Sequence, residues 1–145
     1  TEAILPKKEQ VPSERYGINF KFKAFVFDVK KTSKEPKIFV SRTHPDLVKR
    51  LFEMEVPEIQ SGIVEIKDIA REPGARTKIA VYSSDSNVDA TGACIGHKGI
   101  RVSNVVEELR GEKIDIIEWS PNPAQYISSA LSLSLIHISE PTRPY

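Results

Sequence analysis

The stretch that decides the fold is a pair of glycines around two polar residues, Ile95-Gly96-His97-Lys98-Gly99-Ile100. Because glycine has no Cβ atom, a backbone with two glycines at this spacing can turn tightly and lie close to another backbone. The helix predicted to begin near Ile100 directs free amide groups and the positive end of its dipole toward the loop, and Lys98 adds a full charge. The pattern is typical of a seat for phosphate groups, although G-x-x-G also occurs as an ordinary turn between helices.

The segments on either side of this loop have alternating helix and strand patterns. Leu47, Leu51 and Met54 form an apolar stripe at helical spacing. We expect their helix to be capped by Thr43 and to end at Pro57. Further strands are expected at residues 63–71, 77–82 and 113–119, and further helices at 91–95, 100–109 and from 122 onward. The resulting α-β-β-α-α-β-α order predicts helices packed on one face of a small three-stranded sheet.

The first part of the chain is basic and patterned for strands. Between Arg15 and Arg42 there are eight Lys and Arg residues and two acidic ones, a net charge of +6, whereas residues 61–132 carry a net charge of −2. Aromatic and β-branched residues predict a strand over residues 18–29 with a bulge near Ala24. Shorter strands are expected at residues 2–6 and 38–40. The basic stretch could attract a polyanion, and it is equally typical of a solvated surface.

Composition narrows the class of protein. The chain has 145 residues, of which 39% are hydrophobic, enough for one ordinary domain or for a small domain and part of another. Its longest apolar runs are too short to cross a bilayer, so no membrane association is expected. Cys94 is the only cysteine, which rules out an intrachain disulfide and fits a cytoplasmic location. We expect neither a metal nor a cofactor.

Other residues offer alternative chemistry. Cys94 and His97 could form a nucleophile and its base, or half of a metal site. No second pair completes such a metal site, however, and free cysteine is commonly buried. The spacing of Asp85, Asn87 and Asp89 is that of a calcium loop without its glycine and distal glutamate, which favours a polar turn. Four aromatic residues of the basic stretch could stack on bases or form a core: Tyr16, Phe20, Phe22 and Phe25.

Several stretches of the chain together resemble a known family. Around the loop the sequence reads Ala70-Arg71-Glu72-Pro73-Gly74, Thr77-Lys78-Ile79-Ala80-Val81, Gly92-Ala93-Cys94-Ile95-Gly96 and Gly111-Glu112-Lys113-Ile114-Asp115-Ile116-Ile117. These stretches resemble the first KH domain of the NusA family of bacterial transcription termination/antitermination proteins. Upstream, Glu2-Ala3-Ile4-Leu5-Pro6 and Ser41-Arg42-Thr43-His44-Pro45 resemble the later part of that family's S1 domain and its link into KH.

The resemblance implies an α+β fold and a role in RNA binding. Residues 1–42 would be a partial S1 (OB-like) β-barrel remnant, and residues 43–132 a helical linker and a bacterial-type (type II) KH domain. The chain would be a monomeric, non-enzymatic part of an elongation factor that contacts nascent single-stranded RNA. In the full-length parent, RNA polymerase would be a partner, and pausing, termination and antitermination would be modulated. In KH domains the G-x-x-G loop grips about four nucleotides, which assigns RNA contact to Gly96, His97, Lys98 and Gly99, bordered by Ile95, Ile100 and Arg101.

Two other functions are compatible with parts of the sequence, and the C-terminal residues need a separate interpretation. The first rival is a KH-containing RNA binder of the translation machinery, such as a ribosomal protein or a KH-tailed GTPase. The S1-then-KH order and the Arg71-Glu72-Pro73-Gly74 stretch oppose it. The second rival is a thiol enzyme that uses Cys94. Residues 133–145 resemble the translation of a transposase sequencing adapter, and we interpret them as a non-native tail.

Overall fold

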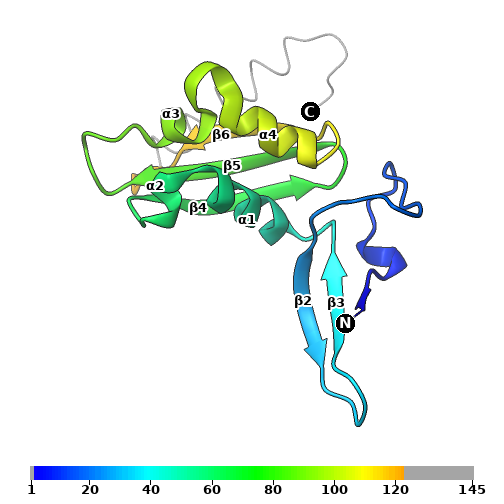
Figure 1. Cartoon of the computed structure of the whole chain (residues 1–145). Coiled ribbons are helices and arrows are strands. Elements are labelled where there is room, and N and C mark those ends of the chain that lie inside the picture. The colour runs from blue at the N-terminus through cyan, green and yellow to red at the C-terminus, as the bar shows by residue number, and fades with distance from the viewer. Residues whose placement is uncertain (1, 123–145) are drawn as a thin grey trace.

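The computed structural model of the chain describes residues 2–122, which form two three-stranded sheets with helices over one of them (Figure 1). The N-terminal part contains β1 (Ala3–Ile4), a 3₁₀ turn (Lys7–Glu9), β2 (Phe25–Lys30) and β3 (Lys37–Ser41). The larger part contains α1 (Pro45–Glu55), α2 (Pro57–Gln60), β4 (Val64–Glu72), β5 (Arg76–Ser83), α3 (Ala90–Ile95), a 3₁₀ turn (His97–Gly99), α4 (Ile100–Glu108) and β6 (Lys113–Glu118). The helix predicted from residue 122 onward and the tail at 133–145 lie outside the described residues.

The larger part has the layering that the sequence predicts. Its sheet has the order β4-β5-β6, and the central β5 is antiparallel to β4 and parallel to β6. Helices α1 to α4 lie on one face of this sheet (Figure 1). The core between the layers is built largely from Val48, Phe52, Ile79, Val81, Cys94 and Val105. The predicted α+β class and the α-β-β-α-α-β order are confirmed. None of the helices in residues 2–122 combines the length and the apolar character needed to cross a membrane.

The first helix begins one residue later than the capping prediction placed it. The N-cap of α1 is His44, whose ring Nδ1 accepts a hydrogen bond from the backbone N–H of Asp46 at 3.0 Å. The hydroxyl of Thr43 lies 3.3 Å from that of Ser41 instead. The prediction of Thr43 as the cap was therefore wrong. The ring nitrogen of His44 accepts the capping hydrogen bond that a threonine hydroxyl was expected to accept. Pro45 occupies the first turn, where a residue without an N–H is tolerated.

The long strand predicted for residues 18–29 was wrong over its first half. Strand β2 starts only at Phe25, because Phe20 and Phe22 pack against Tyr16, with ring centroids 6.3 and 5.2 Å from that of Tyr16. The guanidinium of Arg110 lies 4.8 Å from the ring centre of Phe20, a cation–π distance. Packing on the nearby Tyr16 and on the distant Arg110 outweighs the strand propensity of the aromatic residues.

The N-terminal sheet has β3 at its centre. Strand β1 is parallel to β3 and β2 is antiparallel to it, so the short strands predicted at residues 2–6 and 38–40 are confirmed. The register of β2 shifts between Val26 and Asp28, which places the bulge after the predicted position near Ala24. The identity of this sheet as an S1 barrel remnant, and the division of the chain at residue 42, stay predictions.

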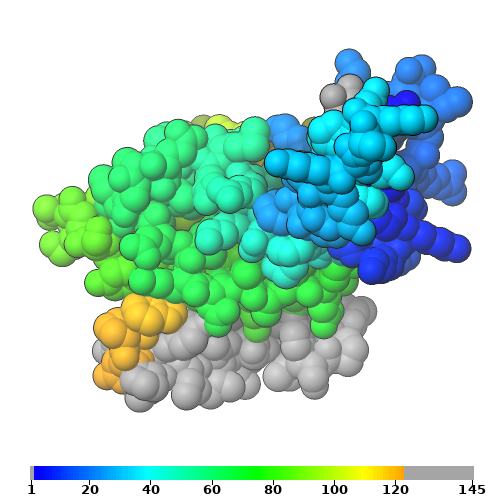
Figure 2. Space-filling model, turned by 90° about the horizontal axis from the view of Figure 1, so that it is seen from below, coloured from blue at the N-terminus to red at the C-terminus, as the bar shows by residue number. Residues whose placement is uncertain are grey.

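A buried arginine joins the N-terminal part to one end of the larger part, where Figure 2 shows the two in contact. The side chain of Arg42 is 0% exposed, and it donates to both carboxylate oxygens of Glu14, at 2.9 and 2.5 Å. It also donates to the backbone oxygen of Glu108 at the end of α4, at 2.9 Å, and to that of Lys23 at 2.8 Å. One guanidinium therefore holds together three segments that are far apart in sequence.

A second buried ion pair organises the sheet of the larger part. The Glu112 carboxylate accepts two hydrogen bonds from Arg71, at 3.0 and 2.9 Å, and both side chains are 1% exposed. It also accepts from the backbone N–H of Gly74 at 2.8 Å and from the hydroxyl of Thr77 at 2.5 Å. The remaining arm of Arg71 donates to the backbone oxygen of His44 at 2.9 Å. The turn between β4 and β5, the start of β6 and the start of α1 are thus tied to one carboxylate.

Replacing Glu112 with alanine is expected to destabilise the fold strongly. The guanidinium of Arg71 would remain buried without its anion, a situation that costs about 3–5 kcal/mol. The matched control is Glu118→Ala, which removes an exposed carboxylate from the far end of β6, the strand that begins next to Glu112. Urea unfolding of both variants and the parent measures the difference. Equal stability of the two variants would contradict a structural role for the buried pair.

The Arg42 junction is expected to weaken in acid. Burial opposes ionisation of Glu14, but hydrogen bonds from Arg42 and Tyr16, with the charges of Arg42 and Arg110, lower the pKa of Glu14 below its ordinary 4.5. Its ionised form therefore contributes stability above pH 4.5, and this contribution is lost as the pH falls through the lowered pKa. Urea unfolding of the parent and of Glu14→Gln, from neutral pH downward, should show a stability difference that shrinks below pH 4.5. A constant difference would contradict the assignment.

Candidate nucleic-acid interface

The loop between α3 and α4 is built from backbone conformations that favour glycine. Gly96 ends α3 with φ 80° and ψ 171°, a region that essentially only glycine occupies. Gly99 precedes α4 with φ 74° and ψ 16°, in the left-handed region. Lys98 also has a positive φ, of 56°. A hydrogen bond of 3.0 Å from the N–H of Gly99 to the oxygen of Gly96 closes the turn. Both glycines therefore have a conformational reason to be present.

The two glycines differ in the space around them. A Cβ atom added to Gly96 would lie 2.6 Å from Cγ of Arg101, so the backbone of the loop lies against the stem of that arginine. A Cβ atom added to Gly99 would meet nothing within 4 Å. Gly96 is thus required by packing as well as by conformation, and Gly99 leaves open space beside the start of α4.

The start of α4 lies beside two exposed polar side chains, and its first amide, that of Ile100, donates to the backbone oxygen of His97. No side chain caps the helix at Gly99, and α4 is nine residues long, so its first-turn amides carry the positive end of a helix dipole. The side chains of His97 and Lys98 beside them are exposed. The structure brings these groups together as the sequence predicted, in an arrangement that suits an anion.

Two exposed isoleucines flank this polar loop. Ile95, the last residue of α3, is 40% exposed, and Ile100, the first residue of α4, is 55% exposed. Side chains of this size are usually buried, and apolar groups beside an anion seat suit a ligand with both charged and flat apolar parts. A nucleotide has both, because its phosphate is charged and the faces of its base are not.

Arg101 is held by other parts of the protein. Its Nη1 donates to both oxygens of Glu58, at 3.2 Å each, and to the backbone oxygen of Ala93 at 2.7 Å. The predicted border residue therefore lies next to the loop, but its charge is already paired. Sequence reasoning did not identify Glu58, which lies 43 positions away in the chain.

The thiol of Cys94 lies in the core. Cys94 is 0% exposed, and burial, together with the charge of Glu58, raises its pKa to about 12. A thiol with such a pKa is protonated at neutral pH and is a poor nucleophile, whereas the side chain of His97 is exposed. The backbone N–H of Asn87 bonds the carboxylate of Asp85 at 2.9 Å, as in a polar turn. Within residues 2–122 no group of three or more His, Cys, Asp and Glu is placed to hold a metal ion.

The aromatic candidates for base stacking have protein partners. The hydroxyl of Tyr16 donates to Glu14 at 2.7 Å and accepts from the backbone N–H of Val11 at 2.9 Å. Phe20 and Phe22 pack on Tyr16 as described above, and Phe25 stacks on the ring of His44 with centroids 4.6 Å apart. The structure therefore supports the packing alternative for these four rings.

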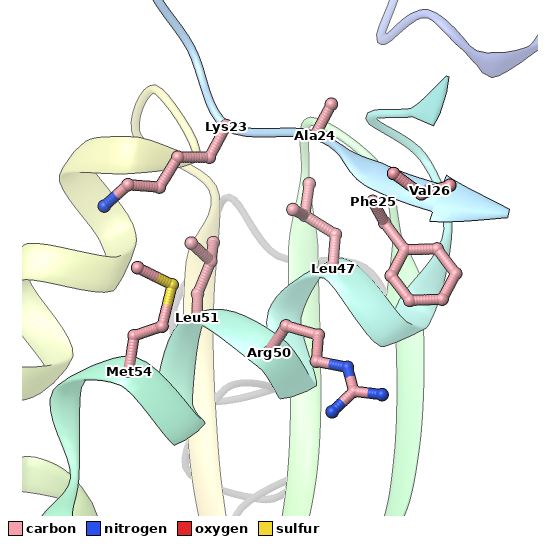
Figure 3. A pocket seen from close by; sticks show the side chains of 8 residues that line it. All are labelled: Lys23, Ala24, Phe25, Val26, Leu47, Arg50, Leu51 and Met54. Atoms are coloured by element: carbon pink, nitrogen blue, oxygen red, sulfur yellow. The ribbon is translucent and has the colours of Figure 1, made fainter. Parts of the chain in front are cut away.

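A groove of about 490 Å³ lies where the two parts meet (Figure 3). Its lining residues come from α1 and from the start of β2 and the segment before it: Lys23, Ala24, Phe25, Val26, Leu47, Arg50, Leu51 and Met54. The walls are mostly apolar, and Arg50 at the rim is paired with Glu53 at 2.9 Å. The groove shares no residue with the loop at residues 95–101, so it belongs to the junction rather than to the anion seat.

Comparison with known proteins identifies the family. Residues 42–119, more than half of the chain, match the family model of the NusA-like first KH domain. The chain belongs to this family. Its match covers α1 to β6 and therefore includes the α3–α4 loop. This finding favours the NusA-type interpretation of the KH domain over a ribosomal protein or a KH-tailed GTPase.

Similar full-length proteins extend the match beyond the KH domain. The chain is 54% identical to the transcription termination/antitermination protein NusA of Halalkalibacterium halodurans, over 93% of this chain and 35% of that protein. It is 53% identical to the Bacillus subtilis protein, over 93% and 36% of the two chains, and 53% identical to that of Thermus thermophilus, over 90% and 34%. The chain therefore spans about a third of the length of these relatives. The assignment of individual loop residues to RNA stays a prediction.

Asparagine substitutions are expected to separate the two loop glycines. Gly99→Asn should cost about 1 kcal/mol or less, because asparagine tolerates the left-handed region and the site is open. Gly96→Asn should cost about 3 kcal/mol, because the conformation excludes side chains and the new Cβ meets Arg101. Thermal unfolding of the two variants measures the contrast. Equal losses would mean that the loop conformation described above is incorrect.

Proposed function

We propose that this chain is the RNA-binding part of a bacterial transcription termination/antitermination factor, and that the α3–α4 loop contacts single-stranded nascent RNA. The observation that carries the proposal is the uncapped start of α4, with Lys98 beside it and an exposed isoleucine on each side. The names of the relatives supply the process, termination and antitermination of transcription.

The loop would bind RNA by contacting its phosphate backbone and its bases at the same time. Phosphate oxygens would accept hydrogen bonds from the first-turn amides of α4, while Lys98 would supply a charge. Gly96 and Gly99 would let the RNA backbone lie close, because no Cβ atom intervenes. Ile95 and Ile100 would contact the faces of bases, a contact that every base can make. Binding of this kind grips a single strand with little dependence on its sequence.

The wider role follows from the relatives. We propose that the longer protein also contacts RNA polymerase and modulates pausing, and that it acts in the cytoplasm. A binding role without catalysis agrees with the protonated, buried thiol of Cys94. We further propose that the chain works as a monomer and needs no cofactor.

Reversing the charge of Lys98 is expected to abolish tight RNA binding while leaving the fold intact. Aspartate tolerates the left-handed conformation of this position, and an acidic residue beside a helix start interacts favourably with the dipole by about 0.3–1 kcal/mol. A bound phosphate would instead meet like charge. The matched control is Lys49→Asp, which makes the same change of charge at an exposed site on α1.

The measurement is a titration of the full chain with a single-stranded RNA oligonucleotide beside a thermal melt. Lys98→Asp should weaken binding by about tenfold or more, equivalent to at least about 1.4 kcal/mol, and Lys49→Asp by much less. If both variants bind like the parent, the loop is not the RNA site. If both lose binding equally, the effect is one of overall charge.

A further inference from the structure

One side chain connects three helices around the loop. Arg101 belongs to the first turn of α4, its stem lies where a Cβ of Gly96 would be, and its guanidinium bonds both Glu58 in α2 and the carbonyl of Ala93 in α3. The last carbonyls of a helix have no partner within it, so a guanidinium bound there also faces the negative end of the α3 dipole. The direction of α4 relative to α3 is thereby fixed.

We propose that Glu58 is a positioning residue for RNA binding. It holds the guanidinium of Arg101 against the end of α3, and so it fixes the direction in which the amides of α4 and Lys98 face the RNA backbone. This inference rests on the proposed function of the loop. In it, Arg101 acts through its contacts within the protein and makes no contact with phosphate.

Because the Glu58–Arg101 pair is partly exposed, its positioning role can be tested separately from a general effect on folding. The side chains of Glu58 and Arg101 are 29% and 30% exposed, and pairs of this exposure contribute little to stability. Loss of the pair should therefore leave a folded chain in which only the bond to the carbonyl of Ala93 holds the guanidinium against α3. The consequence is a loop whose donors are poorly aligned, since hydrogen bonds weaken steeply with angle.

Electrostatics and positioning predict opposite signs for the loss of Glu58. A carboxylate beside an anion seat repels phosphate, so its removal would tighten RNA binding if charge alone decided. If Glu58 instead competed with RNA phosphate for Arg101, removal of Glu58 would free the guanidinium to bind RNA. Binding would again be tighter. Only a positioning role makes the neutral variant bind more weakly.

The chain supplies a matched control in Glu55. Its carboxylate also contacts α4, accepting from the side-chain amide of Asn104 at 3.1 Å, one turn beyond Arg101. Glu55→Gln and Glu58→Gln remove the same charge from the same side of α4, but only the second loosens Arg101. Arg101→Lys is the companion variant, because lysine keeps the charge but its nitrogen ends one bond short of the Nη1 atom that donates to Glu58 and Ala93.

The experiment is an RNA titration of the full chain over a range of salt concentrations, with Lys98→Ala as the reference. We expect Glu58→Gln and Arg101→Lys to weaken binding by about fivefold relative to Glu55→Gln, the loss equivalent to an ion pair of this exposure. The salt slope should stay that of the parent in all three. Lys98→Ala should lower it by about 0.7, the value for one phosphate contact with a single strand.

The outcomes separate the positioning role of Glu58 from the proposed RNA-binding role of the loop. If Lys98→Ala weakens binding but Glu58→Gln binds equally or more tightly, the positioning role is wrong and the RNA site stands. If the slope of Arg101→Lys or Glu58→Gln falls with that of Lys98→Ala, phosphate contact is disturbed directly and the inference is overturned. If neither the parent nor any variant binds RNA, the proposed function is wrong, and the inference about Glu58 fails with the proposed function.

Discussion

The carboxylate of Glu112 is the interaction on which the rest of the larger part depends. It is buried with four hydrogen bonds from three residues, Arg71, Gly74 and Thr77. A buried charge is tolerated only when its lone pairs are satisfied in this way. The bonds fix the β4–β5 turn to the start of β6, which sets the parallel register of β5 and β6. The sheet against which α3 and α4 pack is therefore specified at one end by a polar network and over its face by an apolar core.

Helix α4 transmits this order to both ends of the molecule. Its first turn forms the loop at Gly99, and its last residue, Glu108, is held by Arg42 of the N-terminal part. Between the two ends Val105 is buried against the sheet. A nine-residue helix is rigid along its axis. The same helix therefore carries the contact with the N-terminal part at one end and sets the orientation of the loop at the other. This arrangement gives the N-terminal residues a structural role in addition to any contact of their own with RNA.

Local patterns predicted the fold well, and contacts between distant residues account for what they missed. The stripe of Leu47 and Leu51 and the glycine pair at 96 and 99 are local signals, and the structure has the helix and loop they indicate. The pairing of Arg101 with Glu58 spans 43 positions and that of Arg42 with Glu108 spans 66. Neither has a spacing that a pattern could reveal, because both depend on how finished elements pack. In residues 18–24 the strand propensity is overridden in part by a distant residue, Arg110, and in part by the nearby Tyr16.

The distribution of charge explains why the site has to be so local. Residues 61–132 carry a net charge of −2 and so offer RNA no attraction through bulk charge, whereas the net +6 lies between Arg15 and Arg42. At physiological salt the field of an exposed charge is screened within about 8 Å. The basic N-terminal part can therefore raise the rate at which RNA arrives, but it cannot hold a phosphate at the α3–α4 loop. Under the proposed function, retention would fall to the groups in direct contact with phosphate, the amides of α4 and the ammonium of Lys98. Amides have fixed directions, and so the strength of the proposed site would depend on the side chains that hold α4 in place as well as on those that touch the ligand.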